Sequence, residues 1–171
     1  MNRDNQRSRV YKATWAANAR ARDLGIPMLV SDAPDPMRDA LWFVRRISDW
    51  AEYRAITPRI QRPVANIPAR RNRLDITLKR KGSRWSEAGT DWKRTERGGK
   101  VIVRPELSIA PDHLNSKWIL IHEACHWVGE MDDLGHGPVF ANAYLHTSAK
   151  FIDPTYADVL REEYLNHRVE W

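Results

Sequence analysis

The sequence predicts an α+β fold in which a small mixed sheet packs on a metal-binding helix and further helices flank that helix. Three observations lead to this prediction. An apolar run at residues 118–121 passes directly into His122-Glu123-Ala124-Cys125-His126. Short β-rich stretches broken by Pro and Gly occupy residues 57–104. Segments with apolar residues at helical spacing stand on both sides of these two regions.

The N-terminal third is predicted to be mainly helical. Residues 1–8 are polar and are expected to form a flexible tail. The segment Val10–Arg22 fits either an alanine-rich helix or a short strand, because Val10 to Trp15 also alternate. After a turn rich in Pro and Asp, Met37–Tyr53 is predicted to form a helix. Its core-facing residues are Leu41, Val44, Ile47, and Trp50 or Ala51.

The middle of the chain predicts strands and the last third predicts helices. Three strand candidates are Arg62–Ile67, Leu74–Leu78 and Lys100–Arg104. Helices are expected over Pro138–Lys150 and from Asp153-Pro154 through Arg168, because each begins with a Pro suited to a first helical turn. Their predicted inward-facing residues, with the following Phe151, are Phe140, Ala143, Tyr144, Tyr156, Val159, Leu160 and Tyr164.

Length and composition favour one compact domain over residues 1–171. The chain is 42% apolar, which is sufficient for a core at this length. The single cysteine excludes a disulfide framework and agrees with a reducing compartment. No apolar stretch is long enough to span a membrane, and the first ten residues contain no apolar signal segment. We therefore expect a cytoplasmic protein, located in the host cytoplasm if a phage encodes it.

The pentapeptide 122–126 carries the chemistry. On a helix, His122 and His126 stand one turn apart on one face, so both imidazoles can bind one metal ion. Glu123 lies about 100° round the helix, where it can contact a metal-bound water without being a ligand. Asn115 or Ser116 supplies the N-cap. The pattern predicts a zinc site, which needs a third protein ligand and an open fourth position.

Two residues are candidates for the third ligand. His136 lies in Gly135-His136-Gly137-Pro138, where the chain breaks before a new helix. Asp132 completes an HExxHxxGxxD pattern similar to that of the metzincins, but no methionine follows Met131 to form their methionine turn. His136 is favoured, and Asp132 or Asp133 then becomes a candidate partner for an imidazole N–H.

The residues HEACH, followed by HGPVF at 136–140, resemble the SprT-like zinc metallopeptidases, in which a third histidine opens the next helix. The chain is also similar to a group of small metallohydrolases of actinobacteria and their phages. The resemblance covers about residues 100–150. It implies a zincin-like fold, ligation by His122, His126 and His136, and Glu123 as the catalytic carboxylate. It also implies that the strand flanking the metal helix, here Lys100–Arg104, offers its edge to a peptide.

The loop between the last two histidines is shorter than in many SprT-like proteins, and no zinc-ribbon cysteines follow it. The predicted function is peptide hydrolysis by zinc-activated water, with Glu123 as general base. Tyr144, Tyr156 and Arg161 are alternative oxyanion donors. Cys125 is expected to be a buried core residue. The remaining histidines are expected to be structural or incidental: His113, His146 and His167.

Charge is distributed unevenly along the chain. Residues 54–104 hold 15 Lys or Arg and 4 Asp or Glu, whereas residues 105–171 hold 4 and 11. Within the basic part, tryptophans Trp85 and Trp92 stand among cations, a composition suited to phosphate contact and base stacking. Nucleic acid is therefore a candidate partner beside a protein or peptide substrate. The alternative functions are a nucleic-acid-binding module with a structural zinc site and a metallohydrolase of a non-peptide amide.

Overall fold

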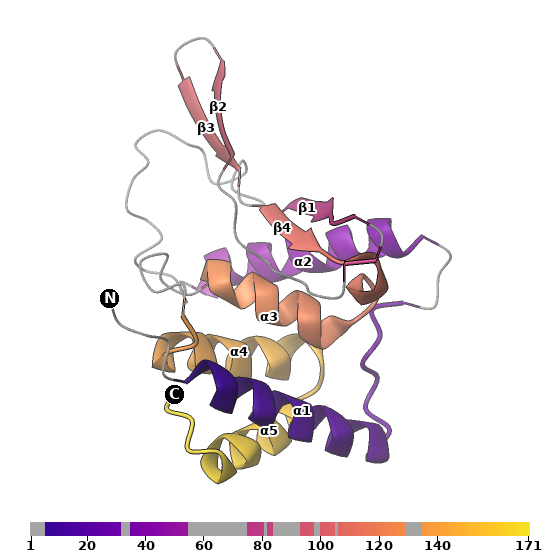
Figure 1. Ribbon diagram of the computed structural model, residues 1–171, viewed down its shortest axis with the longest axis vertical. Helices are drawn as coiled ribbons and strands as arrows, with labels where there is room; N and C mark the ends of the chain where they lie inside the picture. The colour runs from indigo at the N-terminus through magenta and orange to yellow at the C-terminus, as the bar shows by residue number, and fades with distance from the viewer. Residues whose placement is uncertain are drawn as a thin grey trace.

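The fold is mixed and mostly helical. The computed structural model describes residues 6–31, 35–54, 75–80, 82–83, 93–97, 100–104, 106–128 and 135–171. The helices within these ranges are α1 (Arg7–Asp23), α2 (Pro36–Arg54), α3 (Lys117–Val128), α4 (Pro138–Phe151) and α5 (Pro154–Asn166). Figure 1 shows them gathered into one body, with the described strands at one side of it. None of the described helices is long and apolar enough to cross a membrane.

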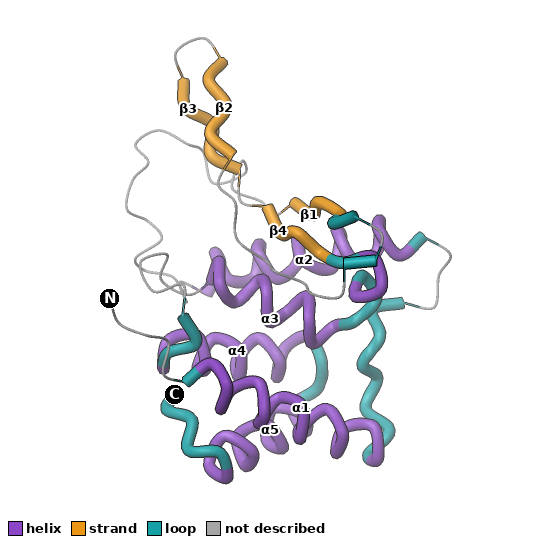
Figure 2. The backbone as a smooth tube through the Cα atoms, in the orientation of Figure 1, coloured by secondary structure: helices purple, strands orange, loops and turns teal. Residues whose placement is uncertain are grey.

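The described strands form two separate pairs. β1 (Asp75–Leu78) pairs in parallel with β4 (Glu106–Ile109), and β2 (Lys93–Arg97) pairs antiparallel with β3 (Lys100–Arg104). The β1–β4 pair lies beside α2, whereas the β2–β3 hairpin projects away from the helices (Figure 2). The single small mixed sheet expected from the sequence is thus, in the described ranges, one parallel pair and one antiparallel hairpin.

Segment 10–22 is helical. Its buried residues lie on one face and three of the five are alanines, so the helix can approach its neighbour closely. They are Val10, Ala13, Thr14, Ala17 and Ala21. α1 begins at Arg7, inside the segment expected to be a tail. It packs along α5, where Arg20 contacts carboxylate oxygens of Glu162 and Glu163 at 2.7 and 2.8 Å.

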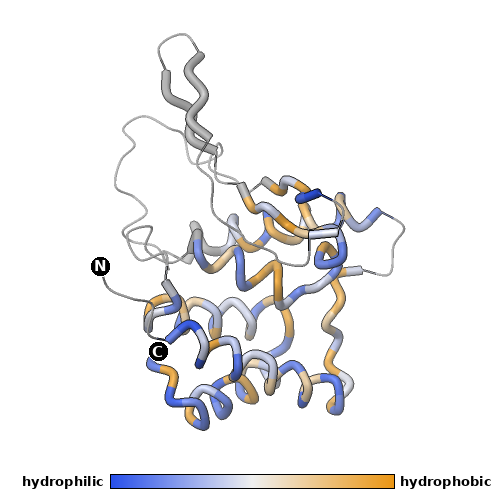
Figure 3. The backbone as a smooth tube through the Cα atoms, viewed as in Figure 1, coloured by the Kyte–Doolittle hydropathy of each residue, from blue (hydrophilic) through white to orange (hydrophobic). Residues whose placement is uncertain are grey.

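α3 runs through the middle of the core. Leu120, Ile121, Ala124 and Cys125 are fully buried. Figure 3 shows polar colour interrupting the hydrophobic colour of this helix, at the point where the histidine motif falls. Ser116 precedes the helix, and its carbonyl accepts the hydrogen bond from the Leu120 N–H, as expected of an N-cap.

Asn115, the other predicted cap, has a different role. Its side-chain oxygen accepts from the backbone N–H groups of Val30 and Ser31 at 3.1 and 3.0 Å. Its amide nitrogen donates to the Ser31 carbonyl at 2.7 Å. Asn115 therefore fixes the connection between α1 and α2 against the start of α3.

The last two helices follow the sequence prediction closely. α4 begins at Pro138 directly after Gly137, and α5 begins at Pro154 with Asp153 as its N-cap. The Asp153 carboxylate accepts from the Thr155 N–H at 2.7 Å. The residues predicted to face inward are buried, with Phe151 partly so. In α2, Val44 and Ile47 are fully buried, and Leu41 and Trp50 are partly buried and pack against the hydrophobic core.

The strand predictions are only partly right. β1 and β3 lie within the predicted strands Leu74–Leu78 and Lys100–Arg104, while Arg62–Ile67 lies outside the described residues. β4 was not predicted; it falls in the part expected to be helical. It is also the strand that directly precedes α3 in the chain, so the expectation that Lys100–Arg104 flanks the metal helix is wrong. That segment belongs to the projecting hairpin.

Candidate metal centre

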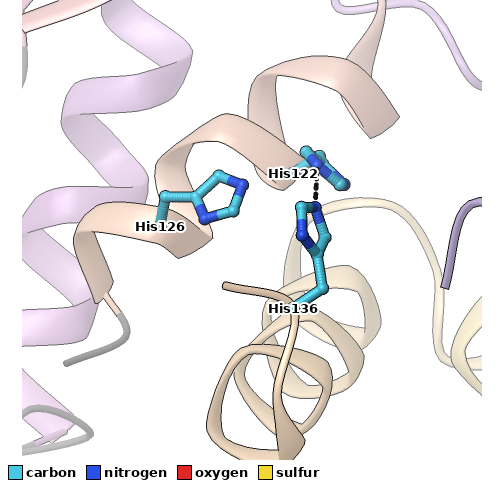
Figure 4. Close-up of side chains that lie close together, drawn as sticks. All are labelled: His122, His126 and His136. Atoms are coloured by element: carbon cyan, nitrogen blue, oxygen red, sulfur yellow. Dashed lines mark hydrogen bonds between the residues drawn. The ribbon is translucent and has the colours of Figure 1, made fainter. Parts of the chain in front are cut away.

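Two histidines and a glutamate emerge from the second half of α3. His122 and Glu123 are 2% and 5% exposed, whereas His126 is partly exposed near the end of the helix. The apolar residues one turn earlier pack the helix into the core, and this packing carries the polar residues inward with them. Figure 4 shows the imidazoles of His122 and His126 projecting from the same side of α3.

His136 approaches this pair from the segment that enters α4. Its side chain is 4% exposed, and its Nε2 lies 3.1 Å from the Nε2 of His122 (Figure 4). One ring nitrogen from each of His122, His126 and His136 lies within 4.8 Å of the other two. Within the described ranges, these three residues form the only such group of possible metal ligands.

The three imidazoles lie close enough to bind one metal ion. Two nitrogens each about 2.05 Å from a tetrahedral zinc ion stand roughly 3.3 Å apart, near the separation between His122 and His136. Burial, and secondarily the charges that His126, His136 and Arg7 would carry, lower the pKa of His122 well below its ordinary value. Because a metal ligand must be a neutral imidazole, this environment favours the ligating form. A set of three nitrogen donors suits a transition ion better than calcium or magnesium.

Aromatic rings enclose the histidines from two sides. The Phe140 ring of α4 lies 4.9, 4.5 and 4.7 Å from the rings of His122, His126 and His136. On the other side, the Tyr11 ring of α1 stacks on His122 at 5.1 Å and 28°. Tyr11 also lies 5.2 Å from His136. These contacts restrict the rotamers of the imidazoles and reduce the access of solvent to them.

Glu123 is a buried carboxyl that directly follows His122 in α3. Loss of hydration raises its pKa to about 8, and the positive charges of Lys79 and Arg7 act in the opposite direction. Lys79 follows β1, and its backbone N–H donates to the Ile109 carbonyl at the end of β4 at 2.9 Å. A bound cation would act in the same direction as Lys79 and Arg7, lowering the pKa of Glu123 and favouring its ionised form. The structure thus contains a buried, ionisable carboxyl one residue along α3 from a candidate metal ligand.

Gln6, which directly precedes α1, connects the backbone of His136 to that of Glu170 near the C-terminus. Its Nε2 donates to the His136 backbone carbonyl at 3.1 Å and to the Glu170 carbonyl at 3.3 Å. Its Oε1 accepts from the Glu170 N–H at 2.6 Å. Because Gln6 is itself buried, these bonds fix the backbone of the proposed third ligand.

The predicted oxyanion donors are engaged elsewhere. The Tyr144 hydroxyl donates to the Trp118 carbonyl at 3.4 Å, and the Tyr156 hydroxyl donates to Asn18 Oδ1 at 2.8 Å. Arg161 contacts Asp158 on the exposed side of α5. The hydrogen bonds of these three side chains thus go to partners other than the histidines, and their role as oxyanion donors stays a prediction.

The other predicted residues divide into three groups. Asp132 and Asp133 lie outside the described residues. Cys125 is fully buried, and loss of hydration raises the pKa of its thiol to about 12. The histidines that do not join the cluster are His113 in a 3-10 turn, His146 on the exposed side of α4 and His167 at the end of α5.

Sequence reasoning missed the contribution of α1. Gln6, Arg7 and Tyr11 all belong to the beginning of the chain, and Lys79 to the segment after β1. The one local signal that could have indicated an aromatic stripe there, the spacing of four residues between Tyr11 and Trp15, was not used in the sequence prediction. Nothing in the local pattern indicated that this stripe meets the histidines.

Comparison of the chain with protein-family models, with curated proteins and with solved structures finds no match.

Proposed function

We propose that this protein is a zinc-dependent metallopeptidase of the zincin type, with His122, His126 and His136 as ligands and Glu123 as general base. One observation carries the proposal: one ring nitrogen from each of three histidines lies within 4.8 Å of the other two, and a buried carboxyl, Glu123, directly follows the first of these histidines on α3. This is the residue set of metal-assisted hydrolysis.

When bound, zinc would lower the pKa of a water molecule and polarise a carbonyl group placed beside it. The protein's own residues supply the remaining steps. The Glu123 carboxylate accepts a proton from the attacking water and returns it to the leaving amine. Arg7 and Lys79, whose charges act on Glu123, favour its ionised form. Tyr11 and Phe140 hold the imidazoles in place and limit competing water.

The alternative function is nucleic-acid binding with a structural zinc site. The composition of the β2–β3 hairpin favours an anionic partner, because five of its ten strand residues are Lys or Arg and one is Glu. The hairpin also projects from the helical body (Figure 1). Contact with DNA is compatible with a peptidase that acts on proteins near DNA.

The test is proteolysis of an unfolded generic protein by the zinc-loaded wild type and by Glu123→Gln, each with and without DNA. We expect cleavage by the wild type and a loss of about a hundredfold or more in the variant, with unchanged zinc content. Glu162→Gln, an exposed glutamate on α5, is the matched control and should cleave normally. The peptidase proposal fails if the wild type cuts nothing, or if Glu123→Gln cuts equally well.

A further inference from the structure

The metal centre is continuous with a stripe of side chains along α1. Residues on this stripe recur at helical spacing on one face. They are Tyr11, Trp15, Asn18 and Arg22. On α3, Trp118, His122 and His126 occupy another stripe, each four residues from the next. The Tyr11 ring touches the rings of His122 and His136, so the two stripes meet at the metal centre.

The two helices run in opposite directions beyond that point. The end of α1 leads to Met28, whose carbonyl accepts a hydrogen bond from the Lys117 N–H at the start of α3 at 3.0 Å. The Lys117 Nζ also donates to the Pro27 carbonyl at 3.0 Å. The beginning of α1 therefore faces the histidine end of α3, and the segment after α1 is tied to the opposite end of α3 (Figure 1).

A cavity of about 340 Å³ lies between these stripes. It is lined by Trp15, Asn18, Arg22, Met28 and Trp118. Trp15 is 6.3 Å from Tyr11 between ring centroids, and Trp118 stands one helical turn, about 6 Å along the axis, before His122. In an extended peptide, side chains on the same face repeat every 6.5–7 Å or so. The cavity is thus about one side-chain repeat from the metal centre.

The lining of the cavity fits a large aromatic side chain. Two indoles and a thioether form its walls, and its volume is at the small end for ligand sites, enough for one side chain. Asn18 Oδ1 accepts from the Tyr156 hydroxyl, which fixes the amide; its nitrogen makes no hydrogen bond in the described part of the chain. Arg22 is the only charged residue of the lining. Trp15 is 60% exposed, so the cavity is open to a substrate.

We propose that this cavity is the substrate side-chain subsite, and that it selects a peptide with an aromatic residue beside the scissile bond and a carboxylate beyond it, next to Arg22. The placement of the aromatic residue beside the bond that is cut rests on the proposed peptidase function. The recognition itself requires only α1, α3 and the segment that carries Met28.

The first experiment needs neither metal nor turnover. Metal-free protein is titrated with N-acetyl-phenylalanine amide or N-acetyl-alanine amide while the indole N–H signals are followed by NMR, with the Trp15 and Trp42 signals assigned from Trp15→Ala and Trp42→Ala. Trp42 is the matched control, because it is 59% exposed and lies on α2, outside the lining. We expect the phenylalanine probe to shift the Trp15 signal and leave the Trp42 signal in place. Equal shifts of both signals, or equal effects of both probes, would overturn the proposal.

The second experiment measures selectivity of cleavage. For capped peptides of the form Ala-Phe-Asp and Ala-Ala-Asp, we expect the wild type to favour the phenylalanine peptide about tenfold in kcat/KM. Trp15→Ala should remove most of this preference and Trp42→Ala should retain it.

Arg22→Gln should lower kcat/KM for the Asp peptide several-fold and leave kcat/KM for a matching Asn peptide unchanged. Equal cleavage of the phenylalanine and alanine peptides overturns the subsite but leaves the peptidase function standing. Selective NMR shifts without any cleavage support the subsite and count against the peptidase function.

Discussion

Helices α3 and α1 both line the candidate metal centre, but the chain encodes their contributions differently. α3 carries His122, Glu123 and His126 within five residues, after an apolar run that buries the helix. α1 carries no recognisable motif, yet Gln6 holds the backbone of His136 and Tyr11 covers two imidazoles. A motif is visible in sequence because its residues share one turn of helix. A contact between residues 6 and 136 depends on packing across the whole fold.

The largest effect should come from the core around α3. Leu120 is fully buried one turn before the glutamate, so Leu120→Ala should lower the free energy of unfolding by roughly 2–5 kcal/mol. The counterpart in α1 is Ala17→Leu, which should cost about 1–3 kcal/mol by overpacking the small-residue face of that helix. Urea unfolding measures both. A larger cost for the α1 substitution would contradict the view that α3 is the centre of the core.

Burial of the Glu123 carboxyl predicts that, without metal, the difference in free energy of unfolding between the wild type and Glu123→Gln depends on pH. The folded-state pKa of Glu123 is about 8, above the unfolded value near 4.3. Its contribution to stability is therefore fully present below the unfolded pKa and is lost as pH rises through the folded pKa. Glu123→Gln cannot undergo this loss. Its free energy of unfolding relative to that of the wild type should therefore rise by roughly 2 kcal/mol or more between about pH 5 and pH 9. Urea unfolding at the two pH values, with a chelator present, measures the change. A constant difference would show that Glu123 is hydrated.

A smaller effect is expected from Gln6. Gln6→Ala removes the bond to the His136 carbonyl and should weaken zinc binding about tenfold, as loss of a residue that orients a ligand typically does. Arg9→Ala is the matched control. Its Nη1 ties α1 to the Arg168 carbonyl at 2.6 Å and forms no part of the histidine cluster. Competition with a zinc chelator gives both affinities. If the two variants lose affinity equally, Gln6 acts only through general stability.

The smallest effect concerns the ring over the imidazoles. Stacking of this kind contributes about 0.5–1.5 kcal/mol, so Tyr11→Ala should weaken zinc binding roughly two- to tenfold. Tyr11→Phe keeps the ring and should bind zinc as the wild type does. The same chelator competition applies. An equal loss in both variants would assign the effect to the hydroxyl group and not to the ring.

The sequence predicted what local spacing determines. The bounds of α2, α4 and α5 follow from Pro and Asp at their starts and from apolar residues at helical spacing. β4 was missed because only Leu107 and Ile109 alternate inward in a strand of four residues, too few to establish a period of two. The hydrogen-bond partners of the Tyr144 and Tyr156 hydroxyls, Trp118 and Asn18, could not be predicted because hydroxyl direction depends on tertiary neighbours. The contact of Tyr11 of α1 with the imidazoles of His122 and His136 was likewise not predicted, because it depends on how α1 packs against the rest of the fold.

Binding of zinc by three histidines is tested by titrating the metal-free wild type and the metal-free His136→Ala variant with zinc. We expect one zinc ion per chain in the wild type, and an affinity for zinc that is weaker by about a hundredfold or more in His136→Ala, because one of three protein ligands is gone. His146→Ala, an exposed histidine of α4, should bind as the wild type does. If His136→Ala binds zinc as tightly as the wild type, or if the wild type does not bind one zinc ion per chain, the three histidines do not form a zinc site.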